Sequence, residues 1–452
     1  MALLLVASRL CHAGILWEGD SLPLATARQM LFGRTIYRDI WNDKPPLVAI
    51  FHLLNGARGG WPLRLLDAAY AWLACWAAYR FARDVWWERE GLWAAALTGF
   101  FLIFDFPATA IPVASDLLLV APHLAAVWLA WKRRPFGCGV VLGIAFWVSP
   151  KALFVLGVCV LWDVSGALVM FMGFAAVVGL GGVWLWLAGA FGAYWTEVWE
   201  WGRAYAASPF VSNPLWNGVV RSGNWLGFHA AAVVAALVFL WRTPAQRWKW
   251  IAWIAFSLAG LTAGMRFFPR YYFLLLPPLV IMAARGFTML GRRAIWVALL
   301  LAIPLARFAP GYWSAVHDRQ WRDTAMDADS RSAAAMTRAL AHPGDTLFVW
   351  GYRPELYVYT GLPAATMYLD SQPLTGVPAD RHLTQSNPID WPSAAARRVE
   401  LAKSRPTFVL DGLSLFNPQL AIDRYPELRE WFMPYREAGR SGETIIYQLR
   451  AR

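Results

Sequence analysis

The sequence predicts a polytopic α-helical membrane protein with a small soluble α/β domain at its C-terminal end. Three observations predict this class. Of the 452 residues, 58% are hydrophobic and only 15% are charged, whereas soluble proteins carry about 25% charged residues. The chain contains 29 tryptophans, and tryptophan is enriched at the boundary between hydrocarbon and water. The long apolar segments end near residue 309, and the remaining residues are more polar.

About eleven apolar segments approach the roughly 20 residues that a membrane-spanning helix needs. The first is short and begins almost at Met1, and no small-residue cleavage site of a secretory signal precedes Trp17. The segment 21–33 has apolar residues at helical spacing and ends in Gly33, which predicts an amphipathic helix lying in the membrane interface. The expected spans are 1–17, 64–82, 91–107, 116–131, 136–149, 152–165, 167–190, 223–241, 250–265, 270–286 and 294–309.

The positions of the basic residues predict the orientation of these spans. Residues 1–310 hold 25 basic and 13 acidic residues, whereas residues 311–452 hold 16 of each. With a cytoplasmic N-terminus, the short cytoplasmic turns are basic, and an odd number of spans places the C-terminal domain outside. We therefore expect an integral membrane protein, in a bacterial cytoplasmic membrane. The basic turn residues are Arg83, Arg89, Lys132, Arg133, Arg134, Arg242, Arg247, Lys249, Arg285, Arg292 and Arg293.

Two domains are expected, a transmembrane domain over 1–309 and a soluble extracytoplasmic α/β domain over 310–452. In the second domain, β-branched and aromatic runs predict three strands, and two further segments read as helices. The strand-like runs are Thr346–Trp350, Thr407–Asp411 and Thr444–Leu449, and the helix-like segments are 324–341 and 393–403. The basic residues flank apolar runs and form no soluble basic face, so nucleic-acid binding is not expected.

Acidic residues at the outer boundary of a membrane are candidates for function. Glu18 and Asp20 follow the first span, and Asp116 opens the fourth. An aspartate at the start of a helix also satisfies free N–H groups, so a structural role is the alternative for Asp116. Glu197 and Glu200 lie in an outer loop that could shape an acceptor site, and a solvated face explains them equally well.

The most specific string is Tyr37-Arg38-Asp39-Ile40-Trp41-Asn42-Asp43-Lys44-Pro45-Pro46-Leu47. Its paired prolines fix the backbone and hold the preceding residue extended. Lys44 is thereby presented rigidly, and a lysine ammonium is a good point-charge partner for phosphate. Basic residues usually lie in cytoplasmic turns, so positive charge on the outer side is unusual. Its presence there favours an anionic ligand on that side.

These features resemble the GT-C membrane glycosyltransferases. The similarity is to the branch with the protein O-mannosyltransferases, the lipid A aminoarabinose transferase (ArnT) and the bacterial Rgt-like transferases. It rests on an acid after the first span, an amphipathic helix ending in glycine, and the YRDxWxxKPPL string. It extends to further strings along the chain: ASDLLLVAPHL at 114–124, FWVSPKALF at 146–154, RFFPRYYFLLLPPL at 266–279 and VWGYRPELYVYTGLPAATMY at 349–368.

The resemblance implies transfer of a sugar from a polyprenyl-phosphate carrier to an acceptor hydroxyl on the outer face. Such a reaction needs a carboxylate to accept the hydroxyl proton and cations to stabilise the departing phosphate. By this resemblance Asp20 is the general base and Asp116 orients the acceptor, and inversion at the anomeric carbon is expected. The family often has an adjacent Asp-Glu pair where this chain has Glu18-Gly19-Asp20. If the two motifs align with a shift, Glu18 is the general base instead of Asp20. Expected phosphate ligands are Lys44, Arg270, Tyr271, Tyr37, Arg38 and Lys151.

Other function classes remain as alternatives. A polytopic transporter or lipid flippase would favour polar residues at mid-membrane and two matching halves, and neither is visible here. An O-antigen ligase or an oligosaccharyltransferase subunit also needs acids and bases on the outer face. The KPPL loop beside the first span is not expected in such proteins. No cofactor and no metal site are predicted, because the acids are few and scattered; a divalent ion held by Glu18 and Asp20 stays open. The acceptor is a lipid, a glycan or a protein.

Overall fold

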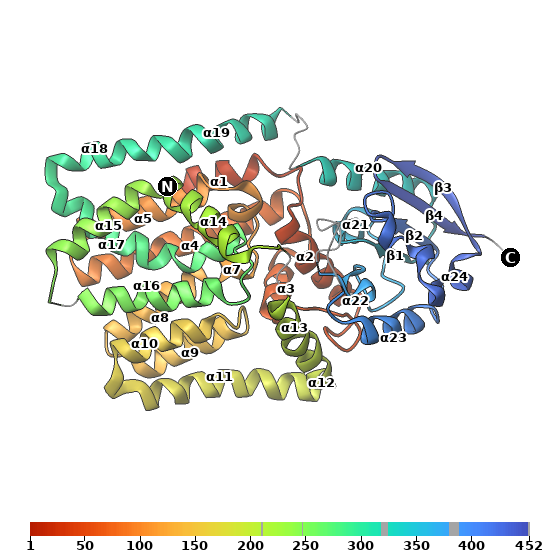
Figure 1. The fold of residues 1–452 in the computed structure, drawn as a ribbon, viewed down its shortest axis with the longest axis horizontal. Helices are drawn as coiled ribbons and strands as arrows, with labels where there is room; N and C mark the ends of the chain where they lie inside the picture. The colour runs from red at the N-terminus through yellow and green to blue at the C-terminus, as the bar shows by residue number, and fades with distance from the viewer. Residues whose placement is uncertain (209–210, 246, 318–323, 379–387, 451–452) are drawn as a thin grey trace.

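A computed structural model describes residues 1–208, 211–245, 247–317, 324–378 and 388–450. It consists of a long helical domain and a smaller α/β domain that covers one end of it (Figure 1). The helical domain contains α1 (Ala2–Leu10), α2 (Glu18–Leu31), α3 (Leu47–Phe51), α4 (Trp61–Val85), α5 (Glu88–Ile103), α6 (Pro107–Ala110), α7 (Ser115–Leu118), α8 (Val120–Trp131), α9 (Pro135–Phe146), α10 (Ala152–Trp162), α11 (Ala167–Leu187), α12 (Phe191–Tyr194), α13 (Trp201–Ala207), α14 (Pro214–Phe228), α15 (Ala230–Arg242), α16 (Arg247–Thr262), α17 (Leu276–Leu290), α18 (Ala294–Ala298) and α19 (Ala302–Val316).

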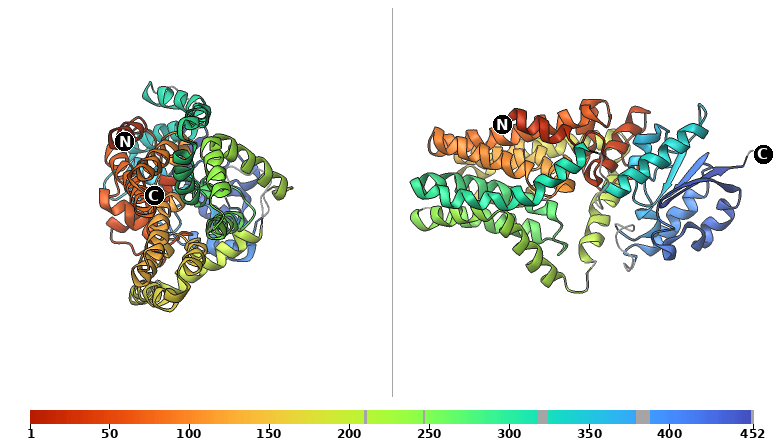
Figure 2. Two further views of the ribbon diagram at one scale, coloured as in Figure 1. Left: turned by 90° about the vertical axis from the view of Figure 1, so that its left-hand side faces the viewer. Right: turned by 90° about the horizontal axis from the view of Figure 1, so that it is seen from above.

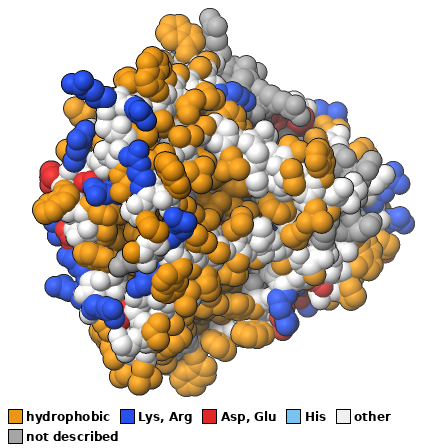
Figure 3. All heavy atoms as spheres, turned by 60° about the vertical axis from the view of Figure 1, so that its left-hand side comes forward, with side chains coloured by type: hydrophobic (Ala, Val, Ile, Leu, Met, Phe, Trp, Pro, Cys, Tyr) orange, Lys and Arg blue, Asp and Glu red, His pale blue; other side chains and the backbone are white. Residues whose placement is uncertain are grey.

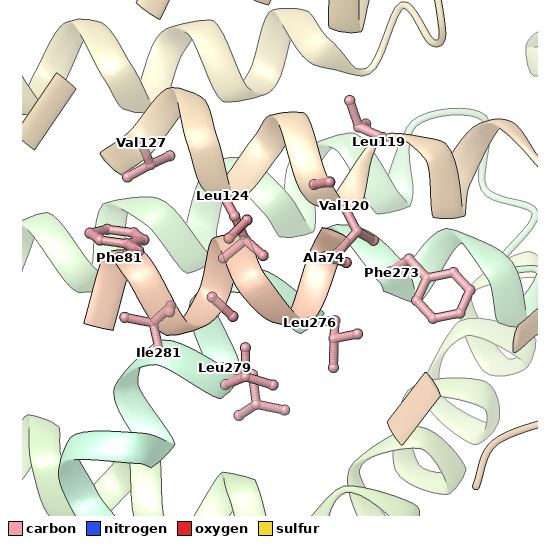
Figure 4. Close-up of a cluster of buried hydrophobic side chains, with 14 of the residues drawn as sticks. Ala74, Phe81, Leu119, Val120, Leu124, Val127, Phe273, Leu276, Leu279 and Ile281 are labelled. Atoms are coloured by element: carbon pink, nitrogen blue, oxygen red, sulfur yellow. The ribbon is translucent and has the colours of Figure 1, made fainter. Parts of the chain in front are cut away.

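The core of the helical domain lies where α4, α5, α8, α10, α15 and α17 pack together. Its buried side chains are alanines, branched aliphatic residues and a few large aromatics such as Phe81 and Trp253. Figure 4 shows Ala74 and Phe81 close to Leu124, Leu276 and other aliphatic side chains of neighbouring helices. Small residues permit close helix approach in apolar surroundings. Gly286 of α17 is an example, because a Cβ there would overlap the backbone of Ala235 in α15.

Two helical stretches are long and apolar enough to cross a membrane by length and composition, Val164–Leu187 and Leu276–Val316. A third candidate is the pair α14 and α15, which is bent by 87°. The span expected over 223–241 is therefore broken near His229, the residue between these helices. Ser115–Trp131, α9 and α10 are apolar but shorter. The number of about eleven spans stays a prediction.

The C-terminal domain contains a four-stranded sheet in the order β1-β2-β4-β3. β1 and β2 are parallel, with Leu347 opposite Phe408, and the other pairs are antiparallel. The three strands expected from the sequence are confirmed, as are the two helices. The elements are α20 (Ala325–Leu340), β1 (Leu347–Trp350), α21 (Glu355–Thr360), α22 (Gln372–Thr375), α23 (Trp391–Leu401), β2 (Phe408–Asp411), α24 (Pro426–Phe432), β3 (Tyr435–Ser441) and β4 (Thr444–Leu449).

The loop 18–63 lies between the two domains, as the right-hand view of Figure 2 shows. Helix α2 buries one side against α21 and β1 through Leu22 and Ala25, and another side against Leu16 and Leu63 through Leu24 and Ala27. The expected amphipathic helix therefore exists, but both of its apolar sides are covered by protein. Backbone contacts fix the C-terminal domain to this loop, among them Trp41 N–H to the Met367 carbonyl at 2.8 Å.

Candidate functional site

A charged cluster forms where α7, the start of α10 and the segment before α17 meet. The Asp116 carboxylate lies 2.7 Å from the Lys151 ammonium and 3.9 Å from Nε of Arg270. The Lys151 ammonium also lies 3.4 Å from the centre of the Tyr271 ring, a cation–π contact. Burial lowers the pKa of Lys151 and Asp116 opposes this, while the charges of Arg270 and Lys44 add to the lowering. The structure thus brings together four residues predicted from three separate strings, Asp116, Lys151, Arg270 and Tyr271.

Local sequence explains how these segments meet. Asp116 lies in the first turn of α7, and Lys151 directly precedes α10. Pro269 begins a short 3-10 helix, Pro269–Leu274, that carries Arg270 and Tyr271, and proline is favoured at the first position of a helix. Gly19 lets the start of α2 pack on the loop before α7, because a Cβ there would lie 2.9 Å from Cγ of Pro112.

Glu18 and Asp20 occupy different surroundings although one residue separates them. Asp20 is fully buried and accepts a hydrogen bond from Nη2 of Arg64 at 2.7 Å. The same guanidinium binds Asp67 and the carbonyl of Ile15, so it holds Asp20 within the protein interior. Glu18 is exposed at the first position of α2, and its charge acts on Arg270. Glu18 is thus the carboxylate that belongs electrostatically to the Asp116 cluster.

The loop that carries Lys44 is held by internal contacts. The Tyr37 hydroxyl donates to the Lys44 carbonyl at 2.7 Å, and Tyr37 is buried with a φ of 67°. A bulky residue in this left-handed region is held there by its surroundings. The Lys44 ammonium lies 2.6 Å from Asp43 and is partly exposed. Arg38 pairs with Asp39 at the surface, so of these three expected phosphate ligands only Lys44 acts on the cluster.

The two acidic residues of the predicted acceptor loop also differ. Glu197 is buried in a π-helical segment, Trp195–Glu200, and accepts a hydrogen bond from the Asn42 backbone N–H at 2.8 Å. Burial raises the pKa of Glu197 to about 9, against the opposing effects of that hydrogen bond and of Arg397. Glu200 is exposed. Glu197 therefore supports the loop that leads to Lys44.

The C-terminal domain contributes a residue that sequence reasoning did not find. Tyr352 lies between β1 and α21, and burial raises its pKa well above the ordinary value, with Glu18, Asp43 and Asp370 acting in the same direction. These interactions place its phenol among the charges of both domains. The string around it, VWGYRPELY, is predicted as part of the soluble α/β domain. Gly351, with a φ of 110°, was the local signal for a special backbone at this position.

An apolar groove of about 420 Å³ is lined by residues close in sequence to the cluster. Leu47 lies three residues after Lys44, Leu118 two residues after Asp116 and Val148 three residues before Lys151. The other lining residues are Ile50, Phe51, Leu54, Tyr70, Leu73, Trp76, Ala77, Ala121, Pro122, Ala125 and Ile144. The arrangement suits a ligand with a long hydrocarbon chain and an anionic end.

The described residues contain no group of three or more histidine, cysteine, aspartate or glutamate side chains placed to hold a metal ion. The four cysteines, Cys11, Cys75, Cys138 and Cys159, are free thiols in the helical domain.

Solved structures share this fold. The ArnT structure from Cupriavidus metallidurans bound to undecaprenyl phosphate matches with a TM-score of 0.61 at 15% identity, over 99% of this chain and 96% of that one. Its apo form matches with the same values. The apo oligosaccharyltransferase from Archaeoglobus fulgidus matches with a TM-score of 0.50 at 13% identity, over 99% of this chain and 74% of that one. No protein-family model and no curated protein matches the sequence. ArnT and the oligosaccharyltransferase are GT-C glycosyltransferases.

Proposed function

We propose that this chain, which has the GT-C fold, is a membrane glycosyltransferase that uses a polyprenyl-phosphate sugar as donor. The observation that carries the proposal is the contact of Asp116 with Lys151 and Arg270 beside Glu18, at the end of an apolar groove. The similar ArnT structure was solved with undecaprenyl phosphate, a molecule with the same two parts: a hydrocarbon chain and a phosphate.

The donor lipid occupies the groove with its hydrocarbon chain and presents its phosphate to the cations. Each of Lys44 and Lys151 is three residues from a residue that lines the groove, Leu47 and Val148 respectively, and we propose that both ammonium groups face its end. Arg270 adds a third positive charge. Cations fixed before the reaction stabilise the charge that develops on a departing phosphate.

Glu18 is the proposed general base in place of Asp20. The acceptor hydroxyl attacks the anomeric carbon, the bond from this carbon to the phosphate oxygen breaks, and the hydroxyl proton passes to Glu18. Polyprenyl phosphate leaves with the bonding electrons. Asp20 is unsuited to this role because it is fully buried and Arg64 binds its carboxylate in the interior. A single displacement inverts the configuration, and Asp116 positions Lys151.

The C-terminal domain closes the acceptor side of the site. The Tyr352 phenol is neutral and interacts electrostatically with Glu18, and a phenol can hydrogen-bond a substrate hydroxyl. The orientation expected from the basic residues puts this domain outside the cytoplasm and the N-terminus inside. The acceptor is then a lipid, glycan or protein of the cell envelope.

The test is mass spectrometry of lipids that co-purify with wild type, Glu18→Gln, Asp20→Asn and the control Glu200→Gln. We expect Glu18→Gln to fold, to lose turnover and to accumulate a polyprenyl-phosphate sugar, whereas Glu200→Gln matches wild type. Wild-type turnover by Glu18→Gln overturns the assignment of the base. If every variant co-purifies with bulk phospholipid alone, even after addition of a polyprenyl-phosphate extract, the proposal of a polyprenyl-phosphate sugar as donor is overturned. Retention of the anomeric configuration in the product, seen by NMR, overturns the single displacement.

A further inference from the structure

A second cavity lies at the opposite end of the helical domain from the C-terminal domain. It measures about 650 Å³ and opens between the ends of α4, α8, α10, α15 and α16. These helix ends lie at the left of Figure 1. The described lining residues are Val85, Trp86, Trp131, Arg133, Trp162, Phe239, Arg242, Thr243, Pro244, Ala245, Lys249 and Trp250.

The wall of this cavity is aromatic and already ordered. The rings of Trp86 and Trp250 stack with centroids 5.6 Å apart, and Trp162 meets Trp250 edge-on at 5.0 Å. The indole N–H of Trp162 donates to the Lys249 carbonyl at 3.3 Å, which fixes this ring to α16. Indole rings favour the level of lipid headgroups. The cavity thus has the rigid apolar wall that suits the glycerol and upper acyl part of a lipid.

The rim of the same cavity is cationic. Arg133, Arg242 and Lys249 belong to the described lining, which contains no carboxylate. Arg133 binds Asp163 at 2.8 Å, so this pair is neutral overall. Arg242 contacts the Met289 carbonyl through Nη1 at 2.7 Å, and Lys249 contacts the Trp162 carbonyl at 3.4 Å. Neither of these two contacts is with a charged group, so the positive charges of Arg242 and Lys249 are not neutralised by these contacts and together amount to +2 at the rim.

We propose that this cavity binds the phosphate of an anionic lipid headgroup, with Arg242 and Lys249 as its cations and Trp86, Trp162 and Trp250 as its apolar wall. A basic pocket between membrane helices is a recurring site for anionic headgroups. Figure 3 shows Lys and Arg side chains among hydrophobic ones on this part of the surface, the composition of a lipid-facing boundary. The site is separate from the Asp116 cluster and does not depend on the proposed glycosyl transfer.

The test is native mass spectrometry of the full-length protein titrated with phosphatidylglycerol, with zwitterionic phosphatidylcholine, and with inorganic phosphate. The variant is Arg242→Gln/Lys249→Gln, since glutamine removes the charge but keeps an N–H donor. The matched control is Arg292→Gln/Arg293→Gln, two exposed arginines at the same end of the domain but outside the cavity lining. Thermal unfolding of each variant shows whether it is folded.

We expect one tightly bound phosphatidylglycerol on wild type and on the control, and at least tenfold weaker binding to the cavity variant. Phosphatidylcholine should bind more weakly than phosphatidylglycerol to wild type. Equal losses in both double variants overturn the proposal, since they indicate a diffuse surface effect. If millimolar inorganic phosphate displaces the lipid, the cavity binds a soluble anion, and the proposal that its ligand is a lipid headgroup is overturned. Unchanged binding by a folded cavity variant overturns the site itself.

Discussion

The Asp116 carboxylate and the Lys151 ammonium are 2.7 Å apart and join α7 to the start of α10. Both side chains are largely buried, so each is the main counter-charge of the other. A residue pair of this kind acts as a unit, because loss of one member leaves the other without compensation in a poorly solvated place. The position of the cation next to the groove is therefore set by the carboxylate.

A double-mutant cycle tests this relationship. We expect Lys151→Met alone to lower kcat/KM by about 100-fold, a loss typical of removing one charge-stabilising group. Asp116→Asn should cause a similar loss, because it releases Lys151 from its position. The double variant should lose little more than either single variant, since residues acting as a unit are not additive. Steady-state kinetics with a polyprenyl-phosphate sugar measures this, and fully additive losses would contradict the coupling.

Asp20→Asn tests the separation of a structural from a chemical carboxylate. Asp20 accepts a charge-assisted hydrogen bond from the buried Arg64. We expect its loss to cost about 1.5–3 kcal/mol of unfolding free energy, the usual range for hydrogen bonds to charged groups. Glu18→Gln, at an exposed position, should stay within about 0.5 kcal/mol of wild type. Denaturant unfolding in detergent gives both values, and equal stability of the two variants would refute the distinction.

The predominance of helix and three of the four strands follow from the sequence because long apolar runs and β-branched runs leave little choice, whereas the break between α14 and α15 does not. β3 was not predicted, since its residues Arg436, Glu437 and Arg440 are typical of a solvated edge rather than a core strand. The burial of both sides of α2 depends on the C-terminal domain packing onto it. That contact joins segments more than 300 residues apart.

The candidate site shows the same division. The sequence predicts Asp116, Lys151, Arg270 and Lys44 because charged residues beside apolar runs stand out, and the structure brings the first three together. The proposal of Glu18 over Asp20 depends on the contact between Asp20 and Arg64, in α4, which the sequence does not show. Tyr352 could not be predicted because a tyrosine in a soluble domain comes under the charge of Glu18 only when the two domains meet.

Glu197 predicts a pH dependence of stability. Its pKa is raised from 4.5 to about 9, chiefly by burial. Between these values the folded state holds a proton that the unfolded state has released, so the unfolding free energy falls as pH rises. Glu197→Gln cannot release a proton and should show a smaller fall in Tm from pH 5 to pH 9. Thermal unfolding of both proteins across this range measures the effect, and parallel curves would disprove it.

Tyr352→Phe tests the contribution of the C-terminal domain to the reaction. The raised pKa keeps the phenol protonated, so it can donate a hydrogen bond at any physiological pH. We expect its removal to lower kcat/KM about tenfold, close to the upper value of one neutral hydrogen bond, with an unchanged Tm. Tyr447→Phe in β4 is the control and should behave as wild type. A loss in both variants, or in neither, would exclude a specific role for Tyr352.

Ala125→Trp tests the groove as the place of the donor chain. Ala125 lines the groove from α8, and an indole there would exclude part of a hydrocarbon chain. Each methylene kept in water costs about 0.8 kcal/mol, so the exclusion of two methylenes of the donor chain from the groove weakens binding about tenfold. We therefore expect KM for a long polyprenyl-phosphate donor to rise about tenfold, while KM for a donor too short to reach Ala125 should change less than twofold.

The control Val234→Trp, on a partly exposed position of α15 outside the groove lining, should leave both KM values unchanged. Because the two donors carry the same phosphate and sugar, an equal rise for both would mean that the substitution disturbs the charged cluster and that the groove does not hold the chain.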